Sequence, residues 1–76
     1  MTYLLLVAGE PLALVSRYVL GFATPQTGLD LDQIDQAIEA EGWCGFDGPT
    51  CRGAIWPADT DADTLQAGLA FVQSAA

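Results

Sequence analysis

The chain has 76 residues, 51% of them hydrophobic, and its ten acids against two arginines, no lysine and no histidine give a formal net charge of -8. The length predicts a single domain over residues 1–76, which the order of its expected elements makes α+β, of marginal stability unless a disulfide, a metal or a second copy helps. The hydrophobic content excludes a disordered chain. Nine acids lie in residues 30–63. The negative electrostatic field of so many carboxylates disfavours direct contact with nucleic acid or an anionic membrane.

The first segment, TYLLLVA (residues 2–8), is a short apolar run that stops at Gly9 and Pro11. A short, punctuated run of this kind predicts a buried strand. Glu10, Pro11 and Arg17 interrupt the apolar stretch and argue against a transmembrane helix. No basic region or small-residue cleavage site indicates a signal peptide, so we expect a cytoplasmic protein.

The next segment, LALVSRYVLGF (residues 12–22), fits two structures. As a helix it would begin at Pro11 and end at Gly21. As a strand it would place Leu14, Tyr18 and Phe22 on one face. The nearby turn and the valine and tyrosine content favour the strand, paired in a hairpin with the first. Residues 23–28, ATPQTG, have the composition of a loop.

A helix over residues 31–41 is the clearest local prediction. Asp30 is a good N-cap, Gln33 stands where a capping box needs it, and Gly42 supplies the end. Leu31, Ile34, Ala37 and Ile38 recur at helical spacing.

RGAIWP (residues 52–57) predicts a short strand that Pro57 closes. A last helix should begin at Thr60 or Asp61, and Gly68 weakens it unless close packing requires glycine there. The expected order is strand, strand, helix, strand, helix. It predicts a small antiparallel or mixed sheet of about three strands, with two helices packed on one face.

The segment GWCGFDGPTC (residues 42–51) contains the two cysteines. Its spacing does not match a redox Cys-x-x-Cys motif, and no histidine completes a zinc site. We interpret it as a connecting loop with two thiols and with Trp43 and Phe46 available to pack or bind. A disulfide between Cys44 and Cys51 is the alternative in oxidised material.

Little in the chain supports catalysis. It has no histidine for general base chemistry, no lysine, and no glycine-rich phosphate loop. Residues 59–63, DTDAD, start like a calcium loop, but Thr64 and Ala70 stand where glycine and a bidentate glutamate are needed. We therefore expect no enzyme activity, no cofactor and no metal.

The acids of the first helix form a stripe, because Asp32, Asp35 and Glu39 are spaced at i, i+3 and i+7 with no lysine nearby. Such a stripe is either an ordinary solvated face that keeps the protein soluble or an interaction surface. The candidate partner-binding residues are Asp32, Asp35, Glu39, Glu41, Asp47, Asp59, Asp61, Asp63 and Trp43.

In size, acidity and lack of catalytic groups the chain resembles small phage-encoded inhibitors, in particular the anti-CRISPR proteins. The resemblance carries over no functional residue. It implies a nucleic-acid mimic whose acids cover the basic surface of a nucleic-acid-binding protein, such as a CRISPR effector. The alternative is an assembly module that docks on a larger subunit or forms a homodimer through its apolar hairpin and Trp43, Phe46 or Trp56, with the acids serving solubility.

Overall fold

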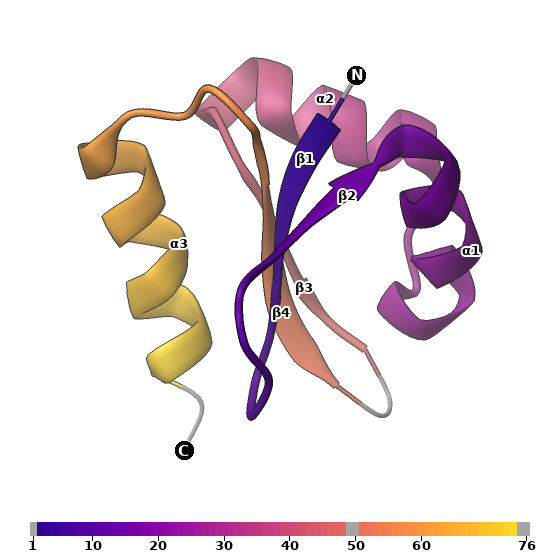
Figure 1. The fold of residues 1–76 in the computed structure, drawn as a ribbon, viewed down its shortest axis with the longest axis horizontal. Coiled ribbons are helices and arrows are strands. Elements are labelled where there is room, and N and C mark those ends of the chain that lie inside the picture. Colours follow the sequence, from indigo (N-terminus) through magenta and orange to yellow (C-terminus); the bar gives the residue numbers. More distant parts are fainter. Residues whose placement is uncertain (1, 49–50, 75–76) are drawn as a thin grey trace.

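The computed structural model describes residues 2–48 and 51–74, which form an α+β fold around one antiparallel sheet (Figure 1). In chain order the elements are β1 (Thr2–Val7), β2 (Ala13–Ser16), α1 (Arg17–Thr27), α2 (Leu31–Glu41), β3 (Cys44–Asp47), β4 (Arg52–Pro57) and α3 (Ala62–Gln73). The α+β class is as predicted, while the sheet has four strands instead of about three and the chain adds a third helix.

The strand order across the sheet is β2-β1-β4-β3, and every neighbouring pair is antiparallel. The predicted hairpin of the first two strands is present, with Thr2 opposite Ser16 and Leu5 opposite Ala13. The central pair, β1 and β4, is formed by two segments far apart in the sequence. The strands β2 and β3 therefore form the two edges of the sheet.

Helices cover both faces of the sheet, so the prediction of helices on one face is wrong (Figure 1). On one face Leu20 of α1 and Ile34 of α2 pack against Tyr3 and Ile55. On the other face α3 packs on the indole of Trp56. Alternate side chains of one strand point to opposite faces, which is why Ile55 and Trp56 belong to different cores.

The segment after β2 is the largest local difference from the sequence prediction. The strand ends at Ser16, whose hydroxyl accepts a hydrogen bond from the Val19 amide at 3.2 Å and so caps α1. Each of the two alternatives for residues 12–22 therefore holds for part of the segment, and the change from strand to helix occurs at an N-cap.

Residues 23–27, expected in a loop, continue α1 through Pro25. A proline inside a helix leaves the carbonyl four residues earlier without its usual donor. Here that carbonyl belongs to Gly21, and the Thr24 hydroxyl donates to it at 2.9 Å. Gly28, with φ of 76°, then ends the helix. Local side-chain chemistry thus compensates for the proline.

The helix α2 is as predicted, from Leu31 to Glu41, with both hydrogen bonds of the capping box between Asp30 and Gln33. Asp61 is the N-cap of α3. A side chain at Gly68 would overlap the Trp56 indole ring, whose Nε1 donates to the Thr64 carbonyl at 3.1 Å. Close packing thus explains the glycine in α3.

The described part of the cysteine segment, residues 42–48 and 51, is not a simple connecting loop, because it supplies the strand β3, which pairs with β4. Cys44 pairs with Ile55, whereas Cys51 lies opposite Gly48, which is four residues after Cys44 and directly follows β3. That offset corresponds to about 13 Å, beyond the reach of a disulfide. Both cysteines are thiols, and burial raises the pKa of Cys44.

Candidate binding surfaces

Both arginines form ion pairs within the protein. Arg17 makes a two-pronged contact with Asp35, with Nη1–Oδ1 at 2.9 Å and Nη2–Oδ2 at 2.8 Å, and its Nη1 also donates to the Tyr3 hydroxyl at 2.9 Å. This contact joins α1, α2 and β1. The hydrogen bonds from Arg17 hold the pKa of Asp35 below its usual range, and the same contact raises the pKa of Arg17.

Arg52 holds the opposite end of the molecule together. Its Nη1 lies 3.1 Å from Oδ2 of Asp47, and its Nε and Nη2 donate to the Phe71 carbonyl at 3.0 and 2.9 Å. The guanidinium also lies 4.0 Å from the centre of the Phe71 ring. A cation at the C-terminal end of α3 suits the helix dipole, so Arg52 joins the β3–β4 hairpin to the last helix.

The predicted acidic surface is therefore smaller than the sequence suggested. Asp35, counted in the unneutralised stripe of α2, is paired with Arg17, and Asp47 is paired with Arg52. Among the described residues, eight acids have no arginine partner. They are Glu10, Asp30, Asp32, Glu39, Glu41, Asp59, Asp61 and Asp63.

Five of these acids gather where α2 ends and α3 begins. The two helices meet there, because a side chain at Gly42 would contact Thr64 at 3.1 Å. Hydrogen bonds from the Thr64 hydroxyl and amide lower the pKa of Asp61. We call this region the acidic end; its exposed members are Glu39, Glu41, Asp59, Asp61 and Asp63.

The other predicted site residues lie elsewhere. Asp32 is exposed in the first turn of α2, at the far end of that helix from Glu41. Asp47 lies at the opposite end of the sheet, beside Arg52. Trp43 is half-buried and packs on Phe71, with 5.5 Å between the ring centres. The structure thus brings together five of the nine candidates.

A second surface, which the sequence prediction did not identify, is apolar. Tyr18 is 75% exposed, Phe22 71% and Leu14 65%. The rings of Tyr18 and Phe22 meet edge to face at 5.0 Å, one helical turn apart. We call these side chains together the β2–α1 surface; they are Leu12, Leu14, Tyr18, Val19 and Phe22. The surface spans both sides of the sheet edge: Leu14 lies opposite Leu4, on the face that α3 covers, whereas α1 packs on the other face.

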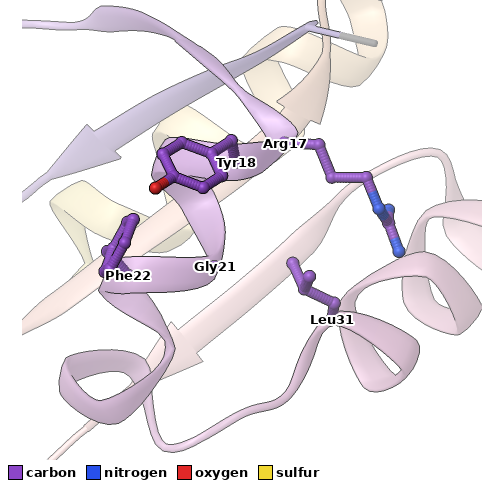
Figure 2. Close-up of a pocket in the computed structure, with 5 residues that line it drawn as sticks. All are labelled: Arg17, Tyr18, Gly21, Phe22 and Leu31. Atoms are coloured by element: carbon purple, nitrogen blue, oxygen red, sulfur yellow. The ribbon is translucent and has the colours of Figure 1, made fainter.

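An open pocket of about 470 Å³ lies between α1 and the start of α2, and Tyr18 and Phe22 of this surface form part of its wall (Figure 2). The rings of Tyr18 and Phe22 stand on one side of Gly21, and Leu31 and the stem of Arg17 stand on the other. Because its walls are mostly apolar and the Arg17 guanidinium lies at one end, the pocket suits an apolar side chain from another molecule.

The sequence prediction missed this surface because it placed residues 12–22 in a strand. With a period of two, Tyr18, Leu20 and Phe22 share one face, whereas on the helix Leu20 is fully buried and the two aromatic rings point outward. The usable signal was Ser16 as an N-cap, followed by Tyr18 and Phe22 at i and i+4.

No family model, curated protein or solved structure matches the chain. Within residues 2–48 and 51–74, no helix has the length and apolar character that crossing a membrane requires. In the same ranges no three cysteine or acidic side chains come together as metal ligands would. What the chain does is therefore inferred from its two surfaces.

Proposed function

We propose that this chain is a cytoplasmic, non-enzymatic binding protein whose acidic end covers a basic, nucleic-acid-binding surface of another protein. The chain would place carboxylates where phosphates otherwise lie and compete for the same lysine and arginine side chains. Given its resemblance to anti-CRISPR proteins, a CRISPR effector is the first partner to test.

One observation carries this proposal: both arginines are used in internal contacts, so no arginine is left to neutralise the acidic end within residues 2–48 and 51–74. Arg17 and Arg52 each pair with an acid outside that end. The remaining negative field is therefore directed outward, where a basic partner would compensate it.

The test compares two double variants that remove the same charge. Glu41→Gln with Asp63→Asn alters the acidic end, and Glu10→Gln with Asp32→Asn alters exposed acids outside it. The N-cap residues Asp30 and Asp61 stay in place in both, which preserves the helix starts. Each variant and the parent chain are used to capture partners from bacterial lysate, and the captured protein is then challenged with DNA.

The expected result is a partner that DNA and half-molar salt both release, and that the acidic-end variant captures more weakly than the control variant. The same comparison applies to a purified CRISPR effector, with its DNA binding measured against increasing inhibitor. A partner that both variants hold equally, and that DNA does not displace, would contradict the proposal.

A second function is favoured by the exposed β2–α1 surface. An assembly module would dock through these apolar side chains on a copy of itself or on a larger subunit, and the acids would serve solubility. The aromatic residues first considered for this role are unsuited to it, since Phe46 and Trp56 are buried and Trp43 is half-buried. Salt distinguishes the two functions, because an apolar interface survives half-molar salt.

A further inference from the structure

The outer edge of β2 lacks the usual protection of an edge strand. Natural edge strands carry lysine, proline, a bulge or a covering element that prevents pairing with another chain. β2 reads Ala13-Leu14-Val15-Ser16, without a charge or a proline, and among the described residues it pairs with β1 alone. The backbone donors and acceptors on its outer side therefore have no partner strand in the described part of the chain.

The β2–α1 surface is also the part of the molecule without net charge. Residues 8–29 contain one acid, Glu10, and one base, Arg17, which Asp35 already pairs. A basic partner would be drawn to the acidic end instead. A second copy, itself carrying a charge of -8, meets the least repulsion at this neutral surface.

The exposed area is close to what a dimer needs. Tyr18 and Phe22 have about 200 Å² each and the leucines and valine somewhat less, so the five side chains, more than half exposed on average, offer on the order of 600 Å² per chain over both sides of the sheet edge. A standard stable interface buries about 800 Å² per partner. Backbone pairing along β2 and the rim around the pocket would supply the difference.

We propose that a second copy of this chain covers the β2–α1 surface, with the two β2 strands paired antiparallel across a two-fold axis. The two sheets then form one continuous eight-stranded sheet. This inference rests on the second function above, assembly, and is independent of the acidic end.

The pairing explains why both parts of the surface are exposed. Antiparallel strands related by a two-fold axis place the same residue of each copy near the axis, so the two Leu14 side chains come together on one face. The helix α1 begins directly after β2, so the two α1 helices approach on the other face. Tyr18 and Phe22 of one copy can then pack on the pocket of the other.

The experiment measures the mass of the intact chain in solution, by light scattering or sedimentation equilibrium, at low salt and in half-molar salt. We expect twice the chain mass of 8.0 kDa at high micromolar concentration. Raising the salt should strengthen the dimer, because it screens the repulsion between two acidic chains. A complex held by the acidic end would weaken under the same change, which separates the two proposals.

Leu14→Glu places two like charges beside the axis and should raise the dimer dissociation constant at least about tenfold. Gln66→Glu, on the exposed side of α3, adds the same charge away from the surface and should leave the dimer intact. Circular dichroism checks that both variants fold, which we expect because Leu14 is mostly exposed. Phe22→Ala tests the α1 part of the interface independently and should also weaken the dimer.

A parent chain that stays monomeric at both salt concentrations would overturn the proposal. So would a dimer that Leu14→Glu leaves unchanged. A different protein that occupies the surface of a monomeric parent chain, and is lost on Leu14→Glu, would also overturn it in favour of a heterologous partner.

Discussion

The two edge strands of the sheet, β2 and β3, have the same length and differ in everything that surrounds them. On β3, Cys44 and Phe46 are 2% and 3% exposed, and α2 and α3 close its two faces. On β2, Leu14 is 65% exposed and Val15 alone packs into the core. The helices α2 and α3 thus cover the β3 edge of this small domain, whereas most side chains of β2 stay exposed.

The two edges also differ in what their side chains contribute to the stability of the monomer. The protected edge contains side chains that the monomer needs in order to fold, whereas the open edge contains side chains that contribute little to the monomer. Substitutions on β3 should therefore change the free energy of unfolding, and substitutions on β2 should change association.

Phe46→Ala on β3 is expected to have the largest effect. Removing a buried aromatic side chain costs about 3–5 kcal/mol, much of the total stability of a small domain. The matched change on β2, Leu14→Ala, should alter monomer stability by no more than about 0.5 kcal/mol. Urea unfolding at low protein concentration, where association is absent, measures both. Similar losses for the two variants would contradict the contrast between the edges.

Gly68→Ala tests how closely α3 packs against the sheet. Alanine favours a helix by roughly 1 kcal/mol, but its methyl group would overlap the Trp56 indole. We expect a net loss of about 1–3 kcal/mol in the free energy of unfolding. Gln66→Ala, at an exposed position two residues earlier, provides the control and should be neutral or slightly stabilising. A stabilised Gly68→Ala variant would mean that α3 lies farther from Trp56.

Asp35→Asn should have a smaller effect, about 1 kcal/mol at neutral pH, because the pair with Arg17 is partly exposed. The folded state lowers the pKa of Asp35, so its contribution is present above the unfolded value of about 3.9 and is lost as the pH falls through the lower folded value. The variant should therefore lose less stability than the parent chain below about pH 4.

The control for this prediction is Glu39→Gln, which removes the same charge from the same helix. Glu39 is exposed and outside the pair with Arg17, so the free energy of unfolding should change by no more than about 0.5 kcal/mol. Thermal unfolding between pH 2 and 7 compares the variants. If Asp35→Asn and the parent chain lose equal stability as the pH falls, the role given to the pair of Asp35 and Arg17 is refuted.

The sequence predicted the elements whose local signals agree with one another. In α2 the N-cap Asp30, the spacing of Leu31 and Ile34 and the terminal Gly42 all favour one helix with one set of bounds. The strand β4 was predicted equally clearly, because the apolar run Ala54–Trp56 is followed by Pro57.

Elements that depend on distant contacts could not be predicted. The strand β3 contains Gly45, which weakens a strand on its own, but a side chain there would clash with Trp43 and Phe71. The helix α1 continues through Pro25 because Thr24 compensates for it. Pairing of Asp35 with Arg17 joins residues 18 positions apart, so the sequence alone overstated the acidic stripe.

The position of Arg52 has a consequence for the order in which the protein opens. One guanidinium holds the carboxylate of Asp47, the ring of Phe71 and the last turn of α3. The end of a helix usually frays independently of its neighbours, but here fraying must also release the hairpin. Hydrogen exchange should therefore find the C-terminal turn of α3 and the paired ends of β3 and β4, at Asp47 and Arg52, opening together as one cooperative unit.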